Sequence, residues 1–166
     1  MADVKEMIGE KVVEKAAEKA AAYINIKPRT AYQVKTYLKG KGYEEDVIEQ
    51  VIAQLKEYGY VNDLKYAEMY FEYGFEKGRG VSRIRRELSE KGVSSEFIDM
   101  AYEELEEVPD QTEMAMEISD SILRGIDTAE LDYDEKRKLQ AKIGRRLMSR
   151  GFSSDVAYKV IQRVVK

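Results

Sequence analysis

Three segments of this chain repeat one pattern, a helix, a glycine turn and a second helix. They read YLKGKGYEEDVIEQVIAQL, ELSEKGVSSEFIDMAYEEL and LMSRGFSSDVAYKVIQRVV. In each copy a leucine precedes the turn glycine by four residues, and an apolar stripe with amphipathic-helix spacing follows it. Such self-similarity constrains the fold more than any single residue does, because every copy must form the same structural unit.

The turn glycines are Gly42, Gly92 and Gly151, which fall where a helix C-cap favours a left-handed residue. Serine pairs at 94–95 and 153–154 then favour the start of the next helix. The number of residues between successive copies leaves room for one further helix in each repeat. The repeat therefore predicts modules of three helices each.

The sequence predicts an all-α protein built from three tandem three-helix, helix-turn-helix-like modules in an extended, curved array. Two prolines and no strand-like alternation support the all-helical assignment. We expect an N-terminal helix with the first module over 1–60, the second module over 61–108 and the third over 109–166.

Local signals place several helix starts. An Ala-rich helix is expected from residue 2 to about 24, and Thr30 with Gln33 reads as a capping box before the next helix. Asn62 or Asp63 is expected to cap the first helix of the second module. One side of the N-terminal helix is apolar and consists of Val4, Ile8, Val12, Ala16 and Ala20.

The composition leaves little enzymatic chemistry. The chain has no cysteine and no histidine, which removes thiol and imidazole catalysis, disulfides and the usual zinc sites. Asp132 and Asp134 suggest either a cation site or the cap of a helix, and the cap is favoured because negative charge suits a helix N-terminus. No catalytic residue, metal or cofactor is expected. A chain with no apolar run of membrane-span length and no signal-peptide pattern is expected in the cytoplasm.

The charges are segregated along the chain although the net charge is only −4. Windows 27–41, 77–91 and 136–150 carry +5, +4 and +7, and the remainder carries −20. All three windows cover the middle helix of a module. Three helices that are basic in register predict a positive stripe, a candidate surface for DNA phosphates or for an acidic protein.

Alignment of the copies places Arg29, Arg79 and Lys138 at the start of the middle helix and Lys41, Lys91 and Arg150 at its end. Cations at a helix C-terminus are explained by the helix dipole, but cations at the start are unfavourable there and suggest a partner outside the helix. Clustered aromatics such as Tyr66 and Tyr70 favour packing over base stacking. The predicted binding residues are Arg29, Lys35, Arg79, Arg83, Arg85, Arg86, Lys91, Lys138, Lys142, Arg145, Arg146 and Arg150.

The stretch 59–92 resembles the central motif of the RecX regulators of bacterial RecA recombinase. The family's motif is an aromatic-rich turn with a pair of acids, a helix with an aromatic-alanine pair, and a glycine-rich link into a basic helix that ends in Leu-x-x-Lys-Gly. Asn62 replaces the first acid of the pair in this chain. The motif residues in this chain include Tyr60, Asn62, Asp63, Tyr66, Ala67 and Gly80. The resemblance extends from about residue 15 to the end of the chain.

This resemblance implies a non-enzymatic protein of homologous recombination, DNA repair and the SOS response. Such a protein binds the RecA–single-stranded DNA filament and inhibits filament growth, ATP hydrolysis and strand exchange. The implied partners are RecA and single-stranded DNA, with duplex DNA as a further candidate, and we expect no membrane association and a monomer. Two rival hypotheses are an autonomous DNA-binding protein that uses its three-helix modules and, with far less support, an enzyme.

Overall fold

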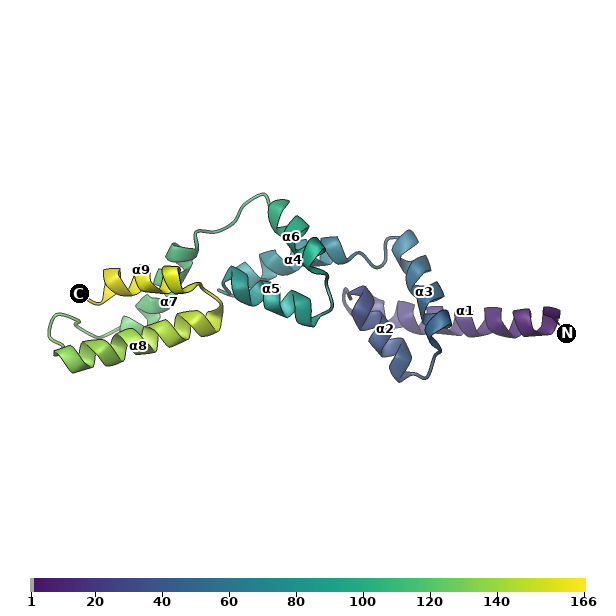
Figure 1. Ribbon diagram of the computed structural model, residues 1–166, viewed down its shortest axis with the longest axis horizontal. Helices are drawn as coiled ribbons and strands as arrows, with labels where there is room; N and C mark the ends of the chain where they lie inside the picture. Colours follow the sequence, from purple (N-terminus) through teal and green to yellow (C-terminus); the bar gives the residue numbers. More distant parts are fainter. Residues whose placement is uncertain (1) are drawn as a thin grey trace. The chain divides into compact units, whose positions relative to one another are not determined.

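The protein is all-helical over residues 2–166, the part that its computed structural model describes. Nine α-helices and no strand occur among these residues, as the sequence predicts (Figure 1). They are α1 (Ala2–Ile26), α2 (Ala31–Gly40), α3 (Glu45–Glu57), α4 (Asp63–Glu76), α5 (Val81–Glu90), α6 (Ser95–Glu103), α7 (Gln111–Leu123), α8 (Tyr133–Arg150) and α9 (Ser154–Val164).

The starts of α2 and α4 confirm the predicted caps. Thr30 and Gln33 form the reciprocal capping box before α2. Of the two candidates before α4, Asn62 is the cap, because its Oδ1 accepts a hydrogen bond of 3.0 Å from the amide of Lys65.

The later helices also begin with side-chain caps. The hydroxyl oxygens of Ser94 and Ser153 accept hydrogen bonds from amides in the first turns of α6 and α9. Asp132 forms a second capping box with Glu135 at the start of α8. Asp132 is therefore used as a helix cap, the interpretation that the sequence favours over a cation site.

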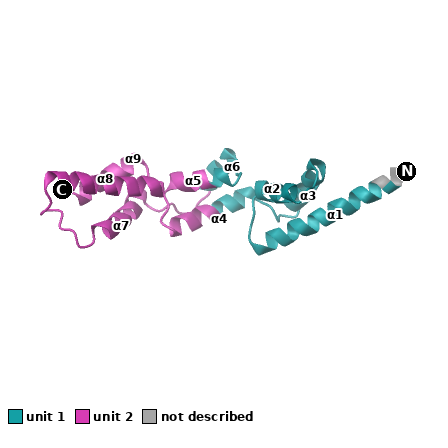
Figure 2. Ribbon diagram, turned by 90° about the horizontal axis from the view of Figure 1, so that it is seen from below, with its two compact units in different colours: residues 1–68, 88–103 teal, residues 69–87, 104–166 magenta. Residues whose placement is uncertain are grey.

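The chain divides into two compact units, which Figure 2 colours separately. Unit 1 comprises residues 1–68 and 88–103, and unit 2 comprises residues 69–87 and 104–166. The core of unit 1 forms where α1, α2 and α3 meet and consists of Ala16, Ala20, Val34, Leu38, Ile48, Val51, Leu55 and Val61. The core of unit 2 forms among α7, α8 and α9 and consists of Ala115, Leu139, Ile143, Leu147, Phe152, Ala157, Val160 and Val165.

The apolar side of α1 is only partly used in the core. Ala16 and Ala20 are fully buried, whereas Val4 and Ile8 are 60% and 58% exposed. The α1 residues that pack in the core begin at Val13, because α2 and α3 are much shorter than α1 and cover its C-terminal half. The sequence period identifies one side of the helix but not how far along it the partner helices extend.

Within unit 1, the start of α2 is bonded to two later segments. The Thr30 hydroxyl donates a hydrogen bond of 2.6 Å to the carbonyl oxygen of Lys91, in the turn after α5. The next amide, that of Ala31, donates one of 2.9 Å to Oδ1 of Asp63, the first residue of α4.

Unit 2 repeats this junction at equivalent positions. The amide of Gly80, before α5, donates a hydrogen bond of 2.8 Å to the carbonyl oxygen of Arg150 at the end of α8. The next amide, that of Val81, donates one of 3.1 Å to Oε1 of Gln111, the first residue of α7. The start of a middle helix therefore binds the following repeat at equivalent positions in both units.

The turn glycines explain how closely these segments approach. Gly92 and Gly151 have φ of 83° and 93°, the predicted left-handed conformation. A Cβ on Gly92 would clash with Tyr32, and one on Gly151 would clash with Arg83. The glycines are therefore needed both for the left-handed turn and for the close approach at the junction. The sequence signal for a helix C-cap predicts only the first of these roles.

Candidate functional site

The predicted cations before and within α2 have partners inside unit 1. The guanidinium of Arg29 lies 4.0 Å from the ring centroid of Tyr23, which stacks on Tyr37 with centroids 4.1 Å apart. Lys35 forms an ion pair with Glu45, and this hydrogen bond raises the pKa of Lys35. Arg29 and Lys35 therefore contact partners within the first repeat.

Two arginines of unit 2 converge on one carboxylate. Glu87 accepts a hydrogen bond of 2.9 Å from Nη1 of Arg79 and one of 2.7 Å from Nε of Arg83. The hydroxyl of Tyr70, on α4, donates a third to Glu87 at 2.8 Å. These four side chains, here called the Glu87 cluster, tie α4 to α5.

The electrostatics of the Glu87 cluster follow from its partial burial and its cations. Burial acts to raise the pKa of Glu87, but hydrogen bonds from Arg83 and Tyr70 and the charge of Arg79 hold it below its usual value. Burial and the hydrogen bond to Glu87 raise the pKa of Tyr70 to about 12. The cluster is therefore an ionised carboxylate held by two cations and a neutral phenol.

The Glu87 cluster supplies a partner for the cation that the sequence places unfavourably before α5. Arg79 is bonded to Glu87 and Tyr70 within the protein. Glu87 is absent from the predicted binding residues, although its spacing of four residues from Arg83 is the signal of a helical ion pair. The contribution of Tyr70 depends on tertiary packing and has no comparable local signal.

The other predicted cations of α5 and the following turn differ in exposure. Arg85 and Lys91 are half-buried, and Arg86 is exposed. Lys91 also contributes its backbone carbonyl to the junction with Thr30. The middle helix of the second repeat is therefore only partly a solvent-facing cationic surface.

The cations of α8 form a separate group. Lys142, Arg145 and Arg146 are exposed and line an open hollow of about 680 Å³ with Ser121, Ile122 and Ser149. No carboxylate lines this hollow, and these three side chains make no ion pair or hydrogen bond with any residue that the structure describes. We call this surface, between α7 and α8, the cationic hollow.

The two remaining α8 cations have different surroundings. Lys138 is exposed but lies within α8 rather than at its start, because the capping box of Asp132 begins the helix at Tyr133. The predicted equivalence of Lys138 with Arg29 and Arg79 as helix-start cations is therefore wrong. Arg150 is half-buried, and its Nη1 donates a hydrogen bond of 3.1 Å to the carbonyl of Lys77.

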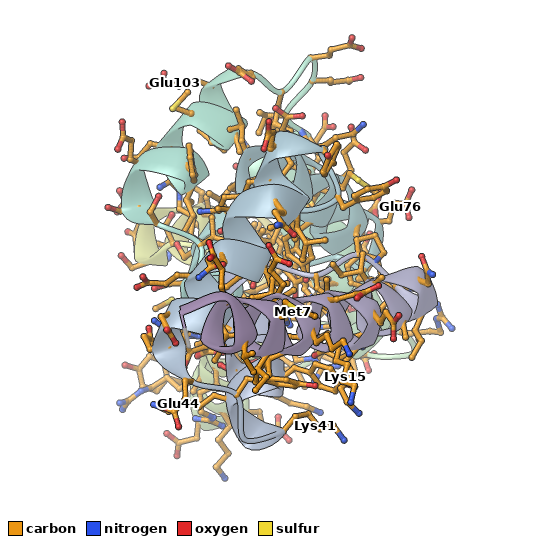
Figure 3. All side chains as sticks on the ribbon, turned by 90° about the vertical axis from the view of Figure 1, so that its right-hand side faces the viewer. Met7, Lys15, Lys41, Glu44, Glu76 and Glu103 are labelled. Carbon is orange, nitrogen blue, oxygen red and sulfur yellow. The ribbon has the colours of Figure 1, made fainter. Side chains whose placement is uncertain are left out.

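The turn after α2 presents charged side chains in unit 1. Figure 3 labels Lys41 and Glu44 there, and both side chains extend away from the ribbon. The ammonium of Lys41 lies 5.4 Å from the ring centroid of Tyr37. Gly42, in the same turn, faces open space.

The residues of the sequence motif serve mainly the fold. Asn62 caps α4, Asp63 accepts the Ala31 amide and Gly80 donates to Arg150, while Ala67 is fully buried. Burial raises the pKa of the half-buried Tyr66. Tyr60 differs from these residues because it is 67% exposed in the turn before α4.

The described residues limit two other kinds of site. In this part of the chain, no group of three or more acidic side chains is arranged to hold a metal ion. Across the same residues, every helix is too short or too polar to cross a bilayer.

Comparison with known proteins identifies the family. The family description "RecX, first three-helix domain" matches residues 16–55, and "RecX, second three-helix domain" matches residues 62–101. The Regulatory protein RecX of Clostridium perfringens strain 13 is 30% identical over 163 residues, which cover 97% of this chain and 74% of the relative. The chain belongs to the RecX family.

Other RecX proteins agree with this assignment. The Regulatory protein RecX of Listeria welshimeri is 29% identical over 157 residues, and the match spans 94% of this chain but 56% of that relative. A crystal structure of RecX from Lactobacillus salivarius superposes with a TM-score of 0.77 at 26% identity, covering 92% of this chain and 96% of that one. This chain therefore spans only about half the length of some curated RecX relatives.

Proposed function

We propose that this RecX-family chain binds the RecA–single-stranded DNA filament and inhibits its growth, ATP hydrolysis and strand exchange. The observation that carries the proposal is the cationic hollow, in which Lys142, Arg145 and Arg146 meet without a carboxylate. Family membership supplies the regulatory role, and the hollow supplies a surface that suits an anionic partner.

The charge pattern favours phosphate as the ligand of this hollow. Three like charges that share one surface repel one another, and phosphate oxygens relieve that repulsion while releasing counterions from the nucleic acid. Arginine also binds phosphate with two parallel hydrogen bonds, which a planar guanidinium is shaped to donate. The α8 cations are therefore the first candidates for DNA contact, ahead of Arg79 and Arg83, which are bonded to Glu87.

The proposed mechanism is occupation of the filament rather than chemistry. The chain lacks the histidine and cysteine side chains that carry much of general acid–base and nucleophilic catalysis. A protein that contacts several recombinase protomers inhibits without one copy for each protomer, because one bound molecule restrains its neighbours. We therefore expect inhibition below one molecule per RecA protomer.

The test is RecA ATP hydrolysis on single-stranded DNA, measured against increasing amounts of the chain. The wild type should inhibit substoichiometrically, and Lys142→Ala/Arg145→Ala/Arg146→Ala should require at least tenfold more protein for the same inhibition. Lys11→Ala/Lys15→Ala/Lys19→Ala removes the same charge from exposed positions of α1 and should inhibit like wild type. Absence of inhibition by the wild type, or hydrolysis of ATP by the chain itself, would overturn the proposal.

A further inference from the structure

A second hollow in unit 2 has the opposite charge. Glu72 and Glu76 on α4, Glu107 in the linker before α7, and Glu117 on α7 line an open hollow of about 530 Å³. We call this surface the acidic hollow. All four carboxylates are on exposed residues, and Figure 3 labels Glu76 at the end of α4.

The floor of the acidic hollow is apolar. Phe75, Met114 and Ile118 line it, and each of the three is half-buried, so apolar surface remains open between the carboxylates. No lysine or arginine lines the hollow. Among the described residues, the four glutamates make no ion pair or hydrogen bond that would neutralise them.

The chemistry of the acidic hollow excludes two classes of ligand. Phosphate-bearing ligands are repelled by four carboxylates, so this surface does not extend the proposed DNA contact. A metal ion requires converging ligands, and no group of three or more acidic side chains in the described residues is arranged to hold one. The carboxylates are spread around an apolar floor, which suits a larger ligand with separated positive charges.

We propose that the acidic hollow binds a short segment of a partner protein that carries lysine or arginine beside apolar side chains. The aliphatic stem of such a cation packs on the floor while its charged end reaches a carboxylate at the rim. Complementary charge at the rim of an apolar contact provides orientation and selects against wrong partners. This inference rests on the proposed function, in which the partner protein is the recombinase.

The two hollows share one helix. Met114, Glu117 and Ile118 of α7 line the acidic hollow, and Ser121 and Ile122, further along the same helix, line the cationic hollow. A cationic protein segment and a phosphate backbone therefore bind along consecutive turns of α7. A nucleoprotein filament presents both components together.

The test compares two charge variants of the full chain. Glu72→Gln/Glu76→Gln/Glu117→Gln removes three charges from the acidic hollow at nearly constant size. Glu18→Gln/Asp120→Asn/Glu130→Gln makes the same charge change at exposed positions that do not line it. Each protein is titrated against RecA without DNA and against a single-stranded oligonucleotide without RecA.

We expect the acidic-hollow variant to bind RecA at least tenfold more weakly than wild type and the control to bind within twofold of wild type. The variant and the control should bind the oligonucleotide alike. Equal RecA binding by the acidic-hollow variant and the control would overturn the inference. Self-association of the wild type that only the acidic-hollow variant loses would also overturn it, because a second copy of the chain would then occupy the hollow.

A direct probe separates this inference from the proposed function. A short synthetic peptide of lysine and leucine, with a glutamate and leucine peptide as reference, is titrated while the methyl resonances of Met114 and Ile118 are followed by NMR. We expect the lysine peptide, but not the glutamate peptide, to shift these resonances. The acidic-hollow variant should bind the lysine peptide at least tenfold more weakly, whether or not the chain binds the filament. Unshifted methyl resonances would contradict the acidic hollow as a binding site even if filament inhibition is observed.

Discussion

The hydroxyl of Thr30 donates a hydrogen bond of 2.6 Å to the carbonyl oxygen of Lys91, 61 residues further along the chain. The same hydroxyl oxygen accepts from the amide of Gln33 at 3.2 Å, so one fully buried side chain both caps α2 and joins it to the next repeat. At the equivalent place in unit 2, the backbone amide of Gly80 makes the bond to Arg150. One junction is thus built once with a side chain and once with the main chain.

Thr30→Val should therefore destabilise the protein by about 2 kcal/mol, because it removes a cap and leaves a carbonyl oxygen of a tight junction unbonded. Thr30→Ser keeps the hydroxyl and should stay within about 1 kcal/mol of wild type. Urea denaturation measures both variants. A larger loss in Thr30→Ser than in Thr30→Val would show that the methyl group of Thr30, which valine keeps, maintains the junction rather than its hydroxyl.

The turn glycines offer a comparison within one chain. Gly42→Ala should cost about 1 to 2 kcal/mol, because its φ of 87° is left-handed but its Cβ would meet open space. Gly92→Ala and Gly151→Ala should each cost about 1 to 3 kcal/mol more, since their Cβ atoms would also clash with the neighbouring repeat. Chemical denaturation of the three variants tests this order, and equal costs would argue against tight junctions.

The Glu87 cluster should make the stability of the protein depend on pH at both ends of the pH scale. The pKa of Glu87 is lowered in the fold, so its contribution is present above the unfolded pKa and is lost as pH falls through the folded pKa. The pKa of Tyr70 is raised to about 12, so its contribution is present below the unfolded pKa of about 10 and is lost as pH rises toward 12.

Tyr70→Phe isolates the alkaline part of this effect. The stability difference between wild type and Tyr70→Phe should shrink as pH rises from about 10 to 12, because only the wild type must keep this phenol protonated. Denaturation midpoints at several pH values give the difference, and the other tyrosines cancel in the comparison. A difference that does not change over this range would mean that Glu87 and burial do not perturb Tyr70 as described.

The cationic hollow predicts a salt signature. Removal of Lys142, Arg145 and Arg146 should lower the magnitude of the log–log salt slope of DNA or filament binding by about 2 to 3, since each phosphate contact contributes about one unit. Binding isotherms at several salt concentrations measure the slope, and circular dichroism checks that helix content is retained. An unchanged slope would show that these three side chains face solvent and contact no phosphate.

Much of the fold is predictable because its signals are local. The helices, the capping boxes and the left-handed glycines depend on residues within one or two turns of each other. The exposure of Val4 and Ile8 was not predictable, because it depends on how far α2 and α3 extend along α1. The division into modules over 1–60, 61–108 and 109–166 stays a prediction, which limited proteolysis tests.

The candidate site was less predictable than the fold. Charge counting finds the basic helices, but it does not separate Arg79 and Arg83, which are bonded to Glu87, from Lys142 and Arg145, which line an open hollow. That distinction depends on tertiary contacts made by Tyr70 and on the packing of α7 beside α8. The acidic hollow had no sequence signal at all, because its glutamates come from three separate segments.

Co-sedimentation distinguishes recognition of the RecA filament from binding to single-stranded DNA alone. The chain is mixed with RecA filaments assembled on single-stranded DNA and, separately, with the same DNA alone at the same salt concentration. We expect the chain to sediment with the filament at concentrations where it leaves the DNA alone unbound. The Lys142→Ala/Arg145→Ala/Arg146→Ala variant should lose this binding. Equal binding to the filament and to the bare DNA would contradict filament recognition and identify an autonomous DNA-binding protein instead.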